Sequence, residues 1–192
     1  MCDLKPLSRN CGDATPPGTR AVLYLAPAEE FTAWPQTLLQ TTPATTVAGA
    51  NKIYDDAFAF VTTAGKGYWR KYDILVDSGL VNSNSVGEPG NLSFQNDVAF
   101  FLTGTTAERM DFAEKVANCC LVAMIQSRED EDNMIVLGRN DDPAKVQEIK
   151  ITTGAKVGDK AGGAYIIKDS TGKTPFSYPI TLGIDILPAT GP

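Results

Sequence analysis

The 192-residue sequence predicts a mostly β protein with one α-helix, folded as an antiparallel β-sandwich or barrel with extended N- and C-terminal arms. Three observations lead to this class. Short runs of β-branched and aromatic residues recur along the chain, turn-forming residues separate them, and only one stretch has convincing helical spacing. No internal repeat is visible, so we expect a single domain over residues 1–192.

The amino-terminal quarter predicts an arm, a strand and a long connection. Residues 1–20 are polar and rich in Pro and Gly, which predicts an N-terminal arm without a core of its own. Residues 21–25 form an apolar run that predicts the first buried strand. Residues 26–51 carry three prolines and a Thr/Ala-rich tract, so we expect an irregular insertion with a turn of helix near 29–34.

The middle of the chain predicts a hairpin, a loop and a long strand. Residues 57–63 and 68–77 are rich in aromatic and β-branched side chains, and Lys66-Gly67 is expected to turn one into the other. Residues 78–91 are polar and predict a loop that exposes three apolar side chains, Leu80, Val81 and Val86. Residues 92–102 predict the next strand.

The helix is predicted from Thr105 or Thr106 to about residue 118. Thr105 and Glu108 have the spacing of a capping box, and an apolar face follows them. Five further strands are then expected at residues 121–126, 134–137, 146–152, 164–168 and 176–182. Residues 184–192 predict a C-terminal arm.

Composition excludes several kinds of site. The chain has no His and a formal net charge of −6, with 23 acidic and 17 basic residues. The chain therefore cannot form a catalytic pair that contains His, or a metal site with imidazole ligands. Its negative charge also disfavours binding to the phosphate backbone of nucleic acids. Because no apolar run reaches the ~18 residues of a membrane span and no signal peptide is visible, we expect a soluble protein made in the cytoplasm.

No motif predicts catalysis, a cofactor or a metal site. Thr171-Gly172-Lys173-Thr174 looks like the end of a phosphate-binding loop, but Ile167 stands where that loop needs Gly. The acidic run Glu129, Asp130, Glu131 and Asp132 lacks calcium-loop spacing, which leaves a solvated turn, a weak cation site or an acidic surface. The vicinal Cys119-Cys120 predicts reduced thiols that act as small buried apolar side chains.

The order of elements resembles that of phage tail tube (major tail) proteins, in particular a group from phages of Bacteroidetes. The matching segments cover most of residues 85–183, and a short N-terminal stretch adds to them. They are Met1-Cys2-Asp3-Leu4 with Cys11, Glu88-Pro89-Gly90-Asn91-Leu92-Ser93-Phe94, the helix, Met134-Ile135-Val136-Leu137-Gly138, Ala164-Tyr165-Ile166-Ile167 and Phe176-Ser177-Tyr178-Pro179. Residues 26–51 match nothing in that family.

The resemblance implies a structural virion protein with no enzymatic activity. Such subunits form rings, usually hexameric, that stack into a hollow tail tube, and DNA passes through the lumen without specific binding. The implied partners are further copies of the chain, the tape-measure protein and other tail proteins. Expected subunit or ring contacts are Leu4, Leu7, Leu80, Val81 and Val86. The acidic run 129–132 is expected to line the lumen, where it repels DNA phosphates.

Other functions stay open from the sequence. Another ring-forming virion component, such as a tail terminator or the inner tube of a contractile system, differs in whether the ring stacks indefinitely. A ligand- or carbohydrate-binding β-sandwich predicts a monomer with exposed aromatic residues around a groove, the candidates being Trp34, Trp69 and Tyr72. An enzyme that uses two carboxylates is the third class, and no acidic pair stands out for it.

Overall fold

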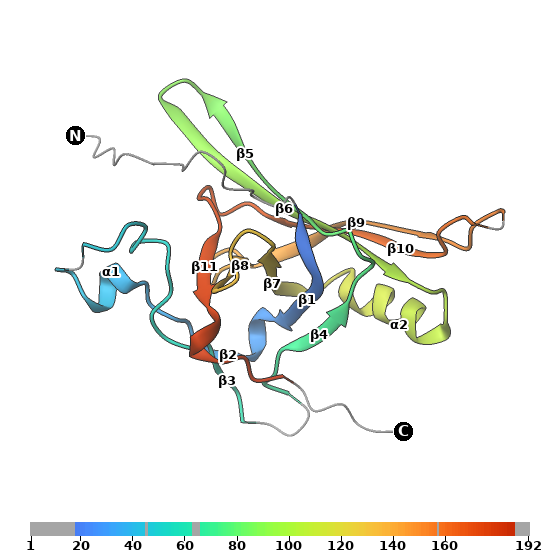
Figure 1. Ribbon diagram of the computed structural model, residues 1–192, viewed down its shortest axis with the longest axis horizontal. Helices are drawn as coiled ribbons and strands as arrows, with labels where there is room; N and C mark the ends of the chain where they lie inside the picture. The colour runs from blue at the N-terminus through green and yellow to red at the C-terminus, as the bar shows by residue number, and fades with distance from the viewer. Residues whose placement is uncertain (1–17, 45, 63–65, 157, 187–192) are drawn as a thin grey trace.

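The computed structural model describes residues 18–44, 46–62, 66–156 and 158–186, and within them the chain is mostly antiparallel β, consistent with a β-sandwich (Figure 1). The strands are β1 (Thr19–Pro27), β2 (Phe31–Ala33), β3 (Ala59–Phe60), β4 (Arg70–Asp73), β5 (Leu80–Glu88), β6 (Asn91–Thr103), β7 (Cys120–Ser127), β8 (Asn133–Leu137), β9 (Ala144–Thr152), β10 (Gly162–Asp169) and β11 (Phe176–Pro179). The helices are α1 (Leu38–Thr41) and α2 (Ala107–Val116), with 3-10 turns η1 (Ala28–Glu30) and η2 (Ile180–Leu182).

Two layers of strands face each other. One layer has the order β5-β6-β10-β9, and the other has the order β4-β1-β7-β8-β11. They join where β7 pairs with the first two residues of β9, and on the far side Leu75 donates a backbone hydrogen bond of 2.8 Å to Phe101 of β6. The sandwich is therefore nearly closed into a barrel.

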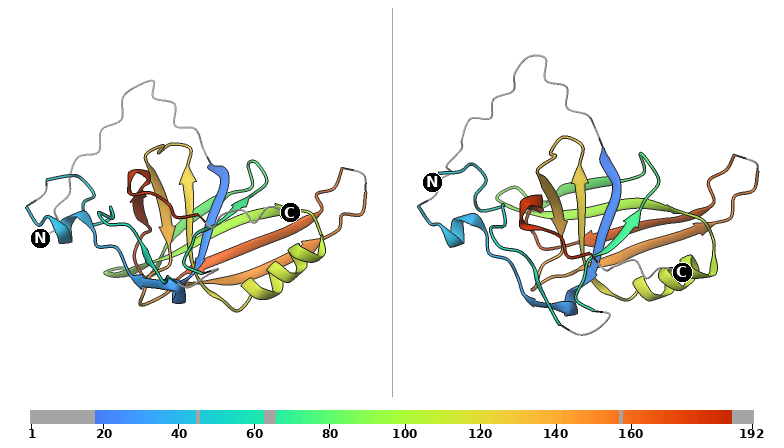
Figure 2. Two further views of the ribbon diagram at one scale, coloured as in Figure 1. Left: turned by 90° about the horizontal axis from the view of Figure 1, so that it is seen from below. Right: turned by 60° about the horizontal axis from the view of Figure 1, so that its bottom comes forward.

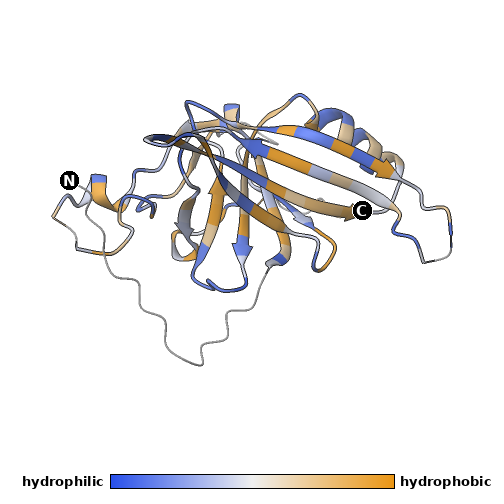
Figure 3. Cartoon of the chain, turned by 90° about the horizontal axis from the view of Figure 1, so that it is seen from above, coloured by the Kyte–Doolittle hydropathy of each residue, from blue (hydrophilic) through white to orange (hydrophobic). Residues whose placement is uncertain are grey.

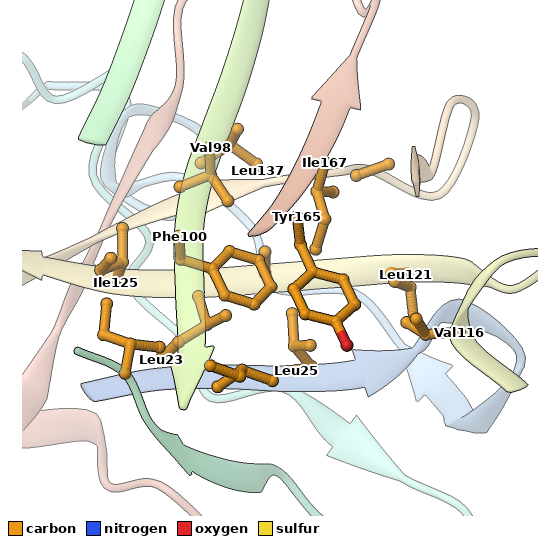
Figure 4. Packing of buried hydrophobic residues seen from close by; sticks show 14 of the residues in the cluster. Leu23, Leu25, Val98, Phe100, Val116, Leu121, Ile125, Leu137, Tyr165 and Ile167 are labelled. Atoms are coloured by element: carbon orange, nitrogen blue, oxygen red, sulfur yellow. The ribbon is translucent and has the colours of Figure 1, made fainter. Parts of the chain in front are cut away.

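The main core lies between the two layers, where apolar side chains alternate inward along each strand. Leu23 and Leu25 of β1 face Val98 and Phe100 of β6, and the Phe100 ring stacks on Tyr165 of β10 at a centroid distance of 5.2 Å (Figure 4). Helix α2 covers one end of this core with two side chains, Ala113 and Val116. Bands of apolar and polar residues along the strands show the same alternation (Figure 3).

A second core covers the other face of β7, β8 and β11. It is aromatic, and its buried members include Tyr54, Phe58, Trp69, Phe176 and Tyr178. Because the second layer is covered on both sides, β7 reads as a continuous apolar run rather than an alternating one. The chain between β1 and β4, which includes the predicted insertion 26–51, supplies much of this cover. That insertion is only partly irregular, since β2, α1 and η1 lie within it.

Two predictions in the middle of the chain are wrong. Residues 78–91 are not a loop: β5 occupies most of them and pairs with β6 over nine residues without a register shift. Its Ser- and Asn-rich sequence has few apolar side chains because residues 83–88 are exposed on both faces of the strand. The predicted hairpin around Lys66-Gly67 does not form either, since β3 pairs with β2 while β4 pairs with β1.

The helix is confirmed, but its predicted cap is not. α2 begins at Ala107 after Thr106, and no side-chain hydrogen bond caps it, so Thr105 and Glu108 form no capping box. Met110 of this helix is exposed, whereas Ala113 and Val116 are buried. The short α1 makes a second helix that the sequence did not predict. In its first turn, Thr37 donates its backbone N–H to the Gln40 side chain at 2.9 Å.

The arms are shorter than expected where the structure describes them. β1 already begins at Thr19, so residues 19 and 20 belong to the sheet. The C-terminal residues 184–186 also belong to the fold, because Trp69 donates its N–H to Asp185 at 2.7 Å and pairs in parallel with Ile186. Residues 1–17 and 187–192, which include Leu4, Leu7, Cys2 and Cys11, lie outside the described residues.

Candidate assembly surface

The first layer ends at β5, a strand with one unpaired edge. β5 pairs only with β6, and no other described strand accepts or donates a backbone hydrogen bond along it. Its sequence, LVNSNSVGE, contains no Lys, Arg or Pro and a single charge at its last residue. Long strand edges invite pairing with another chain, and monomers usually guard them with Lys, Pro or bulges. β5 has none of these guards.

The other end of the same layer is also open. β9 pairs with β10 along its length, but β7 pairs only with its first two residues, Ala144 and Lys145. Among the described residues, 146–152 therefore have a free backbone edge. A bulge at Gln147, which has no partner on β10, interrupts the register there. The layer thus has two unpaired edges, one at each end.

The apolar residues predicted for subunit contacts divide between the two faces of β5. Leu80 and Val86 lie on the outer face and are exposed, at 50% and 39%. Leu92, in the other strand of the hairpin, is 58% exposed. Val81 points inward, is half-buried and packs against the main core. Val81 is therefore part of the core rather than of an exposed contact surface.

Charges of both signs occupy the outer face of the first layer. Register places Asp97, Lys168 and Lys145 side by side across β6, β10 and β9. Glu148 and Lys150 follow on β9, with 3.7 Å between carboxylate oxygen and ammonium nitrogen. With Glu88 of β5, which shares this face, three acids balance the three lysines, although the whole chain carries −6.

The acidic run 129–132 forms the turn between β7 and β8, and all four side chains are exposed. Asp130 holds the turn by accepting backbone N–H bonds from Asp132 and Asn133, each at 3.1 Å. The turn lines an open hollow of about 730 Å³. Figure 2 shows it pointing away from the layer that contains β5, β6, β10 and β9. Whether it lines a lumen stays a prediction.

The remaining candidates from the sequence are placed as follows. Cys119 and Cys120 are free thiols, but Cys120 is exposed, so the prediction of two buried side chains is wrong for it. Trp69 is 1% exposed and belongs to the aromatic core, and Tyr72 packs on Phe112 at 4.8 Å. These two aromatic residues do not line an exposed groove with Trp34.

Within the described ranges, no three His, Cys, Asp or Glu side chains gather as a metal site would require. In the same part of the chain, no helix has the length and apolar character to cross a membrane.

Sequence reasoning missed the two open edges because pairing partners are a property of the folded sheet. The lack of Pro and Lys between residues 80 and 87 was the one available signal. Comparisons with known proteins add nothing to it: no family model, no curated protein and no solved structure matches this chain.

Proposed function

We propose that this chain is the subunit of a phage tail tube, a structural virion protein whose rings, hexameric by the resemblance above, stack into a hollow tube for DNA. The observation that carries the proposal is the pair of open edges at opposite ends of one layer. β5 of one subunit pairs with β9 of the next, so that the layer β5-β6-β10-β9 continues around a ring.

This contact is head-to-tail, because it joins two different surfaces of the same subunit. Such contacts continue from copy to copy until a rotation closes them into a ring. The lengths fit, since β5 offers nine residues and the free part of β9 offers seven. Pairing removes both exposed edges at once, and it covers Leu80 and Val86 next to the junction.

Electron microscopy of the concentrated full-length protein tests the proposal directly. We expect hollow tubes or stacked rings with rotational symmetry. Two blocked variants test the contact itself. Leu80→Lys with Val86→Lys places guarding charges on β5, and Gln147→Pro places a proline in the exposed edge strand at the β9 bulge, where Pro is tolerated.

If the contact is head-to-tail, a mixture of the two blocked variants behaves differently from either variant alone. Each blocked variant alone is monomeric, because every junction needs one β5 and one β9. Mixed in equal amounts, the two variants form dimers through their intact edges and stop there. If the Gln147→Pro variant dimerises alone, β5 pairs with itself and the ring proposal is wrong. A wild-type protein that stays monomeric at high concentration also contradicts it, and a single ring that never stacks indicates a terminator instead of a tube.

A further inference from the structure

A small pocket lies outside the two edges, between the chain that covers the second layer and the turn from β8 to β9. Its volume is about 90 Å³. Its lining residues come from segments far apart in the sequence: Trp34, Pro35, Thr37, Gln40, Tyr54, Arg139, Asn140, Asp141 and Phe176. Aromatic side chains and one cation converge there, which is the composition of a small-molecule site.

One wall of the pocket is formed by aromatic side chains that pack against each other. Phe176 and Tyr54 stack with an interplanar angle of 17° and a centroid distance of 5.1 Å, and both are nearly buried. Burial raises the pKa of Tyr54 to about 12, so its hydroxyl is a neutral hydrogen-bond donor at physiological pH. Trp34 is half-buried and presents a third ring.

Arg139 provides the cation, and among the described residues it forms no ion pair. Its guanidinium carbon lies 4.4 Å from the centre of the Phe176 ring. Among the described residues it has no acidic oxygen within 4.0 Å and donates no side-chain hydrogen bond, whereas three other arginines pair with Glu131, Glu30 and Asp77. The five donors of a guanidinium suit the two oxygens of a carboxylate.

The backbone holds Arg139 in place before any ligand arrives. Gly138, which precedes it, has φ +92 and packs so closely that an added Cβ would lie 2.6 Å from the Leu121 carbonyl oxygen. The Gly138 N–H donates to the buried Asp169 carboxylate at 3.1 Å, and the Arg139 N–H donates to Asp142 at 3.1 Å. These bonds fix the backbone of Arg139, and the contact with the Phe176 ring is the one that orients its guanidinium.

Other charges around the pocket are of both signs, Lys52 and Lys173 being positive and Asp141 and Asp169 negative. Lys52 lies 4.5 Å from the Phe176 ring centre and donates to the Thr174 carbonyl at 2.8 Å. Burial, and then the positive charges of Arg139 and Lys173, lower the pKa of Lys52, while Asp169 opposes this shift. On the rim, Asp141 is exposed and opposes an incoming anion.

We propose that this pocket binds a small aromatic carboxylate, with the carboxylate on the Arg139 guanidinium and the flat ring against the half-buried Trp34, in the pocket that Tyr54 and Phe176 also line. The site is separate from the β5 and β9 edges, so it does not depend on the tail tube proposal. A neutral aromatic amide of the same shape lacks the charge that the guanidinium recognises, and inorganic phosphate lacks the flat apolar group.

Binding can be measured by titrating the full-length protein with benzoate and following tryptophan fluorescence. Of the two tryptophans, Trp34 lines the pocket, whereas Trp69 is buried in the same aromatic core without lining it, so direct contact with the ligand is made by Trp34. We expect saturable binding that Arg139→Gln weakens at least about tenfold, as loss of a charge-assisted pair predicts. Asp141→Asn is expected to tighten it. Arg109→Gln is the matched control, because Arg109 is also half-buried and unpaired among the described residues but lies on α2.

Thermal unfolding of each variant shows whether it is folded. Arg139→Lys keeps the positive charge but lacks the paired N–H donors of the guanidinium, so it is expected to bind benzoate with intermediate affinity. Benzamide is expected to give no saturable signal. The proposal is overturned if benzoate does not saturate, if Arg139→Gln binds it as tightly as the wild type, or if benzamide or inorganic phosphate binds as well as benzoate.

Discussion

Arg70 and Glu30 form a two-pronged ion pair across the second layer. Their nitrogen and oxygen atoms meet at 2.9 Å and 2.8 Å, and the Gly67 N–H donates a third hydrogen bond to the same carboxylate at 2.9 Å. Glu30 is 5% exposed while the Arg70 side chain is 25% exposed. The pair ties the turn after β1 to the start of β4, so it fixes the chain that covers the aromatic core.

Replacing Arg70 with Met is expected to lower the free energy of unfolding by about 3 kcal/mol, because it leaves a buried carboxylate with one hydrogen bond. Urea unfolding measures the change. Arg128→Met is the matched control: it breaks the exposed pair with Asp77, and its expected cost is below about 1 kcal/mol. Equal costs for the two variants would contradict the structural role of Glu30.

The same pair predicts a pH dependence. Burial alone raises the pKa of Glu30, but the Arg70 hydrogen bond, the Gly67 amide and the nearby positive charges outweigh it, so the pKa falls below 4.5. A lowered pKa gives stability that is present above pH 4.5 and lost as the pH falls through the folded-state value. The stability difference between wild type and Arg70→Met should therefore shrink in acid. A difference that stays constant from neutral pH into strong acid contradicts this prediction.

Alanine substitutions at two glycines with the same φ distinguish the cost of backbone strain from the cost of steric overlap. Gly90 and Gly138 both have φ 92, but an added Cβ meets nothing within 4 Å at Gly90, while backbone atoms of Leu121 and Ala144 lie within 3 Å of it at Gly138. Gly90→Ala is expected to cost about 1–2 kcal/mol, the price of a left-handed Ala. Gly138→Ala is expected to cost clearly more, and calorimetry of both variants measures the difference.

Single substitutions on β5 distinguish its two faces. Leu80→Asp is expected to cost about 1 kcal/mol or less in the isolated subunit while it prevents ring formation, because Leu80 is exposed. Val81→Asp is expected to cost above about 2 kcal/mol, because Val81 packs on the main core. Val76→Asp, at an exposed position outside β5, should leave both assembly and stability unchanged. Assembly is measured by light scattering and stability by chemical unfolding.

Charge reversal tests whether the acidic turn lines the lumen. Glu129→Lys, Glu131→Lys and Asp132→Lys together change the formal charge of the subunit from −6 to 0 and retain Asp130, which holds the turn. If the turn faces the lumen, tubes form normally and DNA passes more slowly. If the outer face of the first layer lines the passage instead, this variant leaves ejection unchanged, whereas Lys145→Glu with Lys168→Glu alters it.

The sequence predicted the regular parts of this fold and missed those that depend on distant partners. β1, β6, β7, β10 and α2 lie close to where apolar periodicity placed them, because that periodicity follows from which side chains are buried. β5 was missed because backbone pairing with β6, not burial, makes it a strand. Arg139 was missed because its neighbours Tyr54 and Phe176 come from elsewhere in the chain.

The pairing of β1 with β7 has a consequence for synthesis of the chain. Arg20 at the start of β1 bonds to Glu131 just beyond β7, 111 residues later. A ribosome must therefore release more than half of the protein before β1 acquires its second neighbour, and until then Leu23 and Leu25 have no complete core to enter. The hairpin of β5 and β6, whose contacts are local, can form during that delay. The nascent chain thus presents the unguarded β5 edge while its own core is unfinished, and crowding of nascent chains on one message would favour premature contacts between them.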